Sequence, residues 1–297
     1  CFERLEELQT FDDINTIKAD LSDHGSIVSA IRQSEPDEIY NLAAQSFVGA
    51  SFQQPILTAD ITGLGVLRVL EAMKENAPNA KFYQASSSEM FGDYSSKKNE
   101  TSPFQPRSPY GAAKVFGHHI TNHYREAYGI FACCGILFNH ESPLRGLEFV
   151  TRKITSTLAR IKFKKTNLLK LGNISAKRDW GFAGDYVEAM WLMLQQKKPN
   201  DYVISTGESH SVEEFLSLAT EFAGLGDWHD FVKIDQSAMR PTDIEDLVGD
   251  SSIAQKQLNW KPKTSFHELV KMMVEYDIDF EKLHIDPLEF NKKSQEN

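Results

Sequence analysis

The stretch Lys81-Phe-Tyr-Gln-Ala-Ser-Ser-Ser-Glu89 changes abruptly from apolar residues to hydroxyl and acidic side chains. Its first six residues predict a buried strand, and the serines predict the turn that ends the strand. Further along, Ser108-Pro-Tyr-Gly-Ala-Ala-Lys114 begins with an N-cap residue and a proline suited to the first helical position. A buried strand followed by a helix is typical of a parallel βαβ unit.

The same alternation extends through the first half of the chain and predicts an α/β fold, with a Rossmann-like, doubly wound parallel sheet. We expect strands at residues 16–19, 38–42, 81–86 and 131–138, and helices at 26–33, 56–75 and 110–128. Gly129 is expected to end the last of these helices. Because ligands bind beyond the carboxyl ends of parallel strands, the residues that follow each strand are expected to line one crevice.

From about residue 142 the pattern loosens and predicts a smaller α+β domain, with helices near 149–163, 186–195, 211–223 and 265–276 and strands near 168–171 and 202–205. We expect residues 1–141, with some later segments, to bind a dinucleotide, residues 142–289 mainly to bind the substrate, and residues 290–297 to form a polar tail. A glycine-rich turn for a pyrophosphate normally opens such a fold, and residues 1–15 contain none. The sequence therefore predicts a longer enzyme in which a further segment precedes Cys1.

Composition excludes several classes of partner. The 297 residues carry a formal net charge of −10 and no long basic run, so a nucleic-acid partner is not expected. No apolar stretch approaches the roughly 20 residues that a membrane helix needs, and the first residues do not resemble a signal peptide. With only three cysteines, no disulfide framework is indicated. We expect a cytoplasmic protein that does not bind membranes.

Tyr110 and Lys114 are four residues apart and share one helix face. An ammonium group beside a phenol favours the phenolate, so Tyr110 is a candidate base near neutral pH. Glu89 supplies a second candidate base, which implies chemistry beyond hydride transfer. The spacing alone is equally compatible with a packed tyrosine and a solvated lysine. For His119 and His123, on the same helix, we favour packing over metal binding.

Six stretches, in this order, resemble the extended short-chain dehydrogenase/reductase family and, within it, the GDP-mannose 4,6-dehydratases. They are Glu38-Ile-Tyr-Asn-Leu-Ala-Ala-Gln-Ser46, Phe82-Tyr-Gln-Ala-Ser-Ser-Ser-Glu89, Pro106-Arg-Ser-Pro-Tyr-Gly-Ala-Ala-Lys114, Gly135-Ile-Leu-Phe-Asn-His-Glu-Ser-Pro143, Ala176-Lys-Arg-Asp-Trp-Gly181 and Asp185-Tyr-Val-Glu-Ala-Met-Trp-Leu-Met-Leu194. The resemblance implies conversion of GDP-mannose to GDP-4-keto-6-deoxymannose, with NADP as a recycled cofactor and no metal.

The resemblance also implies roles for individual residues. Tyr110 would deprotonate the hexose 4-hydroxyl, Lys114 would hold the nicotinamide ribose, and Glu89 would remove the C5 proton. Ser87 stands where the family usually has a threonine that binds the 4-oxygen. The remaining cofactor-binding candidates are Asp20, Leu21, Leu42, Ala43, Ala44, Gln45, Ser46, His140 and Arg145. The substrate-binding candidates are Ser88, Asn139, Val150, Lys153, Gly172, Arg178, Arg240 and Asp243.

Some alternatives stay open at this point. The chain departs from the family pattern at Leu57, Leu144 and Asp243, which replace a tyrosine, an arginine and a glutamate. A related 4-keto-sugar reductase or 4-epimerase would share Tyr110 and Lys114, and a catalytically silent protein would keep only the fold. Relatives pair through the helices corresponding to 56–75 and 110–128, so the resemblance implies a homodimer or, with further contacts, a homotetramer.

Overall fold

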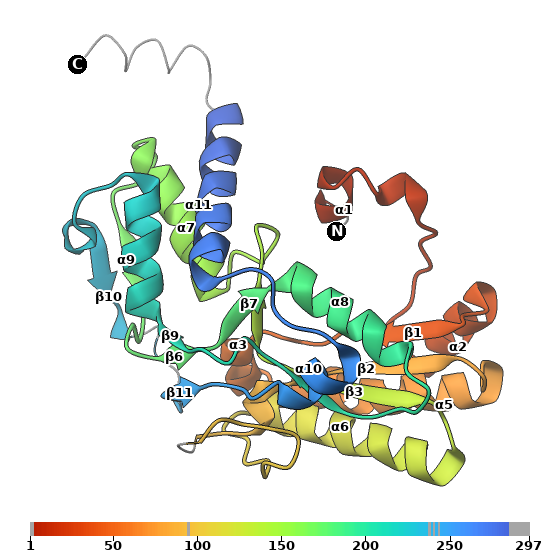
Figure 1. Ribbon diagram of the computed structural model, residues 1–297. Helices are drawn as coiled ribbons and strands as arrows, with labels where there is room; N and C mark the ends of the chain where they lie inside the picture. The colour runs from red at the N-terminus through yellow and green to blue at the C-terminus, as the bar shows by residue number, and fades with distance from the viewer. Residues whose placement is uncertain (1–2, 94–95, 237–238, 240, 243, 285–297) are drawn as a thin grey trace.

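The computed structural model describes residues 3–93, 96–236, 239, 241–242 and 244–284 (Figure 1). Its main sheet has the strand order β1-β2-β3-β8, and every neighbouring pair is parallel. These strands are β1 (Glu38–Asn41), β2 (Lys81–Ser87), β3 (Ala132–Leu137) and β8 (Tyr202–Ile204). The predicted Rossmann-like α/β fold is confirmed.

Helices cover both faces of this sheet because successive side chains of its strands point to opposite sides. Phe82 packs with α2 (His24–Ser34), α5 (Gly65–Asn76) and α6 (Pro109–Tyr128), whereas its neighbour Tyr83 packs with α8 (Ala183–Leu194) and α10 (Ser252–Leu258). Figure 1 shows α6 and α8 running along opposite faces. Near-continuous apolar strands of this kind are typical of parallel sheets buried on both sides.

The predicted strand at residues 16–19 is wrong. These residues form no regular element, and the described sheet ends at β1, whose described strand partner is β2. A strand requires a neighbour for its backbone hydrogen bonds, and among the described residues none is available to this segment. Among the described residues before it, the regular elements are α1 (Glu3–Glu7) and the 3₁₀ turn η1 (Phe11–Asp13).

The single helix predicted over residues 56–75 is interrupted. It consists of α4 (Pro55–Thr58), a π-helical segment η2 (Ala59–Leu64) and α5. Gly117 of α6 lies so close to α5 that an added Cβ would be 3.0 Å from Cγ2 of Val66. This close approach fixes how α6 sits beneath the sheet, and α6 itself begins as predicted, with Ser108 as N-cap and Gly129 in the left-handed conformation at its end.

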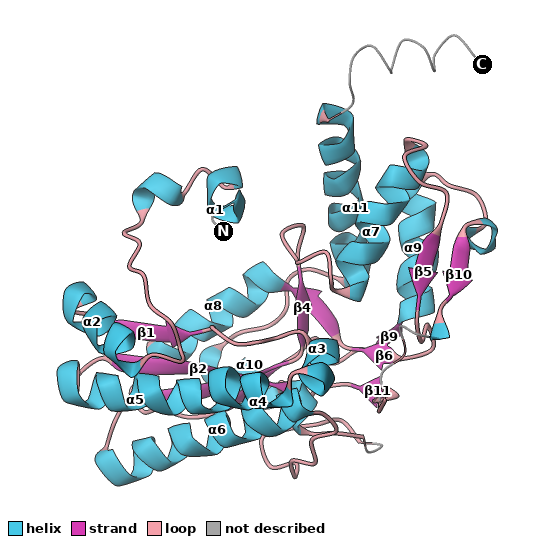
Figure 2. Cartoon of the chain, turned by 180° about the vertical axis from the view of Figure 1, so that it is seen from behind, coloured by secondary structure: helices cyan, strands magenta, loops and turns pink. Residues whose placement is uncertain are grey.

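The second half of the chain builds another core. The helices α7 (Val150–Lys162), α9 (Val212–Ala223) and α11 (Phe266–Leu283) pack around one buried apolar cluster (Figure 2). Beside them, β5 (Leu169–Leu171) pairs with β10 (Val232–Ile234). The short β4 (Asn139–Glu141) pairs with β7 (Trp180–Phe182), while β6 (Lys177–Arg178) lies between β11 (Asp246–Leu247) and β9 (His210–Ser211).

Several short elements were not predicted, namely α3 (Val48–Gln53), α10, β4, β6, β7, β9, β10, β11 and the 3₁₀ turns η3 (Ser88–Met90) and η4 (Trp228–Asp230). Of these, α3, η3, β4, β6 and β7 contribute residues to the cleft described below. The predicted polar tail lies outside the described residues. Among the described helices, none is long and apolar enough to cross a bilayer.

Candidate active site

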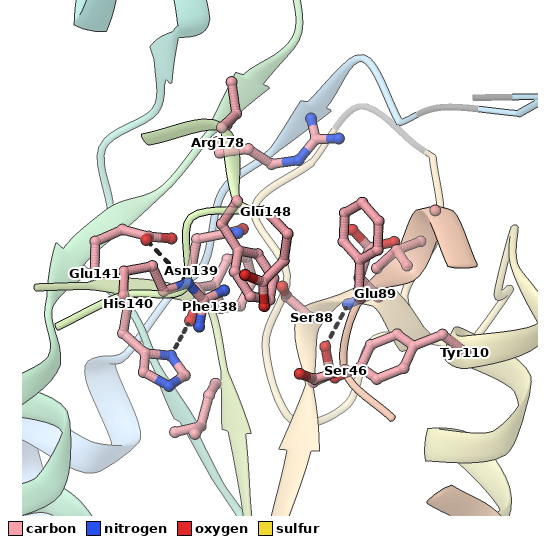
Figure 3. Close-up of a pocket in the computed structure, with 18 of the residues that line it drawn as sticks. Ser46, Ser88, Glu89, Tyr110, Phe138, Asn139, His140, Glu141, Glu148 and Arg178 are labelled. Atoms are coloured by element: carbon pink, nitrogen blue, oxygen red, sulfur yellow. Dashed lines mark hydrogen bonds and ion pairs between the residues drawn. The ribbon is translucent and has the colours of Figure 1, made fainter. Parts of the chain in front are cut away.

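A cleft of about 970 Å³ opens at the carboxyl ends of β1, β2 and β3. All four predicted catalytic residues line it, together with most of the predicted binding residues. In Figure 3, Glu89 and Tyr110 lie on one side of the cleft, and His140 and Glu141 lie on the other. The cleft occupies the edge of the sheet where the sequence predicted the ligand crevice.

The Ser87 hydroxyl links two of the predicted catalytic residues. Its oxygen accepts a hydrogen bond from the backbone N–H of Glu89 at 3.3 Å, and its side chain hydrogen-bonds Tyr110. Residues 87–89 form the turn at the end of β2, called the catalytic turn below. Gly111 lets α6 pack against this turn, because a Cβ at Gly111 would lie only 2.7 Å from the carbonyl oxygen of Glu89. Because position 111 has no side chain, the turn and α6 can contact each other directly beside Tyr110.

The environment of Tyr110 differs from the prediction. Burial raises the pKa of its phenol to about 12; the hydrogen bond from Ser87 and the charge of Arg145 act against this rise, and the charge of Glu89 adds to it. Lys114 was expected to make the phenol more acidic, but its Nζ lies 5.7 Å from the centre of the Tyr110 ring. The desolvation of a buried phenol outweighs the effect of a cation at that distance.

Lys114 itself is buried at the base of the cleft. Its Nζ donates a hydrogen bond to the carbonyl oxygen of Ala85 at 2.7 Å, which ties α6 to β2. Burial lowers the pKa of Lys114 to about 8, because a charged ammonium is disfavoured away from water. An ammonium has three N–H donors, so the bond to Ala85 leaves donors that can reach a ligand.

Across the cleft, β4 presents Asn139 and His140. The His140 Nδ1 is 2.9 Å from the carbonyl oxygen of Phe138, and its ring stacks on Tyr186. Desolvation lowers the pKa of His140 to about 4, so its imidazole is neutral in the physiological range. A neutral ring that donates from Nδ1 keeps Nε2 as an acceptor for a ligand donor.

Cations border the cleft from the second core. The Arg145 guanidinium stacks on Phe149, at 3.5 Å from the ring centre, and its Nε lies 3.1 Å from the buried carboxylate of Glu141. Lys153 comes from the first turns of α7, and Arg178 from β6. One nitrogen of Arg178 donates to the carbonyl oxygen of Ile244 at 2.7 Å, which holds this buried side chain in place.

Most of the site residues predicted from the sequence line this cleft. The predicted residues that line the cleft are Leu42, Ala44, Ser46, Ser87, Ser88, Glu89, Tyr110, Lys114, Asn139, His140, Arg145, Val150, Lys153, Gly172 and Arg178. Four others, namely Asp20, Leu21, Ala43 and Gln45, are not part of that lining, and their cofactor role stays a prediction. Arg240 and Asp243 lie outside the described residues.

Sequence reasoning missed several residues of the cleft. Glu148, Phe149, Val187 and Met190 line it, and the first two lie in the loop before α7. Val187 and Met190 are three residues apart on α8 and were predicted only as part of a helix. Their exposure to a cleft depends on where α8 crosses the sheet, which no local pattern encodes.

The model of one protein family, described as GDP-mannose 4,6 dehydratase, matches residues 1–273. The chain belongs to this family. GDP-mannose 4,6 dehydratase 1 of Arabidopsis thaliana is 56% identical to it over 267 residues, which are 89% of this chain and 74% of that relative. The GDP-mannose 4,6 dehydratase of Homo sapiens is 47% identical over 88% of this chain and 75% of its own length.

Solved structures show the same fold at much lower sequence identity. RMD from Pseudomonas aeruginosa, complexed with NADPH, superposes with a TM-score of 0.80 at 21% identity, over 92% of this chain and 95% of that one. The dTDP-glucose 4,6-dehydratase of Bacillus anthracis, in complex with NAD, superposes with a TM-score of 0.81 at 18% identity, over 95% of this chain and 85% of that one. These likenesses show that this chain has the same fold as these two proteins.

Proposed function

We propose that this protein converts GDP-mannose to GDP-4-keto-6-deoxymannose with loss of water. The observation that carries the proposal is the placement of Glu89 and Tyr110 on either side of the Ser87 hydroxyl, in the cleft of a chain that belongs to the GDP-mannose 4,6-dehydratase family. Two groups able to exchange protons at one point suit a reaction that removes one proton from the 4-hydroxyl of a sugar and another from the neighbouring C5.

The cleft fits a nicotinamide cofactor, and we propose NADP. Small residues after β1, namely Ala44 and Ser46, leave room at the carboxyl edge of the sheet, and Lys114 has donors for ribose hydroxyls. His140, with its neutral ring, lies at the same edge. When bound there, NADP would supply a hydride acceptor for C4 of the sugar and a hydride donor for C6.

The protein's own residues then divide the proton transfers. Tyr110 takes the proton of the 4-hydroxyl, and the Ser87 hydroxyl holds the 4-oxygen. Glu89 takes the proton from C5, which has become acidic beside the new C4 ketone, and passes it to the C6 hydroxyl, which leaves as water. The proton that Tyr110 took from the 4-hydroxyl replaces it at C5 when hydride reaches C6. Tyr110 must be a phenolate to act as a base. Because the pKa of its phenol is raised in the free protein, Tyr110 has to lose its proton before it can accept one from the 4-hydroxyl.

We further propose that the diphosphate of the substrate binds between Lys153 and Arg178. An arginine presents paired donors to phosphate oxygens, and a lysine presents a compact charge. The first turn of α7 adds backbone N–H groups that Phe149, the N-cap residue, does not satisfy with its side chain. We keep the assignment of residues 142–289 to substrate binding as part of this proposal.

The test is to incubate the protein with GDP-mannose and NADP and to follow the nucleotide sugar by mass spectrometry. The expected product has lost one water, and recovery of unchanged GDP-mannose under conditions that support NADP binding would reject the proposal. NADP binding is measured separately by equilibrium dialysis, which also distinguishes an enzyme from a silent protein that keeps only the fold.

Glu89→Gln separates a dehydratase from a 4-keto-sugar reductase or 4-epimerase. A dehydratase should lose about 10²- to 10⁴-fold in turnover when its C5 base is removed, and should stop exchanging the C5 hydrogen with deuterated water. A reductase or epimerase should keep most of its turnover because neither reaction needs that base. Binding of the nucleotide sugar should be retained in either case.

We also propose a homodimer that buries the outer surface of α4, η2 and α6. This surface exposes four large apolar side chains, of which Ile56 is 84% accessible; the others are Leu57, Leu64 and Phe116. A second copy of the chain, docked through the same helices, would cover them as a four-helix contact. Light scattering should give a dimer for the wild type and a monomer for Phe116→Glu. A cytoplasmic location stays a prediction from the sequence.

A further inference from the structure

Below the catalytic turn, four polar residues of β2, β3 and α6 contact one another. They are Ser86, His118, Asn122 and Cys134, and all except the half-buried Asn122 are buried. Tyr110, Lys114, His118 and Asn122 follow one another at intervals of four along α6, so each lies on the same side of the helix as the next. His118 and Asn122 therefore lie one and two helical turns beyond Lys114, so α6 connects the proposed catalytic pair to this buried group.

The contacts form a closed loop of donors and acceptors. The Ser86 Oγ is 3.1 Å from Nδ1 of His118, and Nδ2 of Asn122 is 3.2 Å from Nε2 of the same ring. The Cys134 Sγ is 3.6 Å from Oδ1 of Asn122, which accepts its S–H. The Ser86 hydroxyl, in turn, hydrogen-bonds the Cys134 sulfur and completes the loop.

The charge state of His118 gives the loop a direction. Burial lowers the pKa of His118 to about 4, and the ring faces Asp201, Arg125 and His119. A neutral ring has one donor and one acceptor. Nε2 of His118 is 3.2 Å from Nδ2 of Asn122, which can only donate, and 3.7 Å from Oδ2 of Asp201, which is beyond hydrogen-bonding distance. Nε2 is therefore the acceptor, and Nδ1–H donates to Ser86.

We propose that this loop, Asn122 to His118 to Ser86 to Cys134 and back to Asn122, is a positioning device that fixes the end of β2 for catalysis. Ser86 immediately precedes Ser87, whose hydroxyl joins Tyr110 to Glu89. Every member of the loop has its hydrogen-bonding partner within the loop, and such satisfied networks rigidify the elements that they connect. This inference rests on the proposed dehydratase function.

The same neighbourhood also contains the ligand types of a metal site. His118, Cys134 and Asp201 place one nitrogen, sulfur or oxygen atom each within 4.8 Å of one another. However, both oxygens of Asp201 already accept from Arg125, at 2.8 and 3.2 Å, and Oδ1 also accepts from the backbone N–H of Cys134. Burial raises the pKa of the Cys134 thiol well above its usual value, which opposes the thiolate that a metal requires. The hydrogen-bonded loop accounts for this group without an ion.

The first test compares two deletions of a buried hydroxyl. Ser86→Ala opens the loop, whereas Thr121→Val removes a hydroxyl that bonds only to Gly117 of its own helix, at 2.8 Å. We expect Ser86→Ala to lower kcat for water loss from GDP-mannose roughly tenfold with KM unchanged, since misplaced reacting groups slow the chemical step. Thr121→Val should keep the wild-type kcat. Equal kcat values for Ser86→Ala and the wild type would overturn the proposal.

A second pair of variants tests the sulfur. Cys134→Ser keeps a donor and an acceptor at this position and should retain most of kcat, whereas Cys134→Ala breaks the loop and should behave like Ser86→Ala. Similar losses in both Cys134 variants would show that the volume of the side chain matters and its hydrogen bonds do not. That result would contradict a positioning role for the loop.

A measurement that needs no activity separates this inference from the proposed function. In protein labelled with ¹⁵N-histidine, NMR should find His118 as the Nδ1–H tautomer, with an imidazole proton that exchanges slowly and becomes fast in Ser86→Ala. An Nε2–H tautomer would overturn the assignment. Stoichiometric zinc binding that Cys134→Ala abolishes would replace the loop by a metal site. Absence of wild-type dehydratase activity would reject the function and leave the tautomer measurement valid.

Discussion

Gly111→Ala tests whether the contact between α6 and the catalytic turn sets the activity. The added Cβ would lie 2.7 Å from the carbonyl oxygen of Glu89 and 3.0 Å from Cβ of Pro106, whereas ordinary contact begins at 3.4 Å. The turn and the helix must therefore separate by well over half an ångström, because the obstructing oxygen belongs to the backbone and cannot rotate away. Tyr110 and Glu89 would move apart with them.

A displacement of about 1 Å between reacting groups costs roughly 100-fold in rate, so we expect kcat for water loss to fall by one to two orders of magnitude. The overpacked site should also lower the free energy of unfolding by about 1–3 kcal/mol. KM should change little, because Lys153 and Arg178 lie on other elements. Steady-state kinetics by mass spectrometry and urea denaturation provide the two measurements.

Gly117→Ala is the matched control for this substitution. It adds the same methyl group to the same helix, but the contact at 3.0 Å is with Cγ2 of Val66, a side-chain atom remote from the cleft. This variant should lose stability and keep its kcat. The reasoning fails if Gly111→Ala turns over like the wild type, or if the two variants lose activity equally.

Three further predictions concern charge and burial. The folded pKa of His118 is about 4 against about 6.5 when unfolded, so the unfolded state binds the proton first as pH falls. Lowering the pH from about 7.5 to 5 should therefore reduce the free energy of unfolding of the wild type by about 2 kcal/mol, and that of His118→Gln should not show this loss. Urea titrations at both pH values measure the difference, and equal losses in the two proteins would contradict the lowered pKa of His118. Arg152 makes hydrogen bonds at 2.9 and 3.0 Å to the buried carboxylate of Asp277, and Arg152→Met leaves that carboxylate without its cation. The variant should lose about 3–5 kcal/mol of stability, measured by thermal melting. Adding Asp277→Asn should restore part of this loss, and no recovery would mean that the buried charge is not the cause. Because the pKa of Tyr110 is raised, the stability that its neutral phenol contributes is present below about pH 10 and is lost as pH rises through about 12. In cofactor-free protein, the phenolate absorbance that distinguishes wild type from Tyr110→Phe should appear only near about pH 12. A difference in phenolate absorbance between wild type and Tyr110→Phe below about pH 10 would refute the raised pKa.

The sequence was sufficient to predict the parts of the fold that depend on local chemistry. The helix α6 begins after Ser108 and ends before Gly129 because a cap, a proline and a left-handed glycine mark its limits. Residues 16–19 have the composition of a strand, but pairing depends on a neighbour that no local pattern specifies. The interruption at η2 is similar, since it accompanies the close packing of α5 against Gly117 of α6.

For the candidate site, the sequence predicted where the motif residues lie, but it did not predict the electrostatics of Tyr110. Ser87, Glu89, Tyr110 and Lys114 line one cleft as expected. The acidity of Tyr110 was misjudged, because spacing along a helix places Lys114 on the right face but does not reveal that its Nζ turns to the carbonyl of Ala85. Cleft residues such as Glu148 come from a loop whose position depends on the second core.

The three consecutive serines of β2 and η3 have separate neighbours. Ser86 faces His118, Ser87 contacts Tyr110, and Ser88 lines the cleft. A serine repeat is the kind of sequence that is normally assumed to tolerate exchange and slippage. In this protein, inserting or deleting a single residue there would give each hydroxyl the neighbour of another. The length of the repeat should therefore matter as much as the identity of its residues.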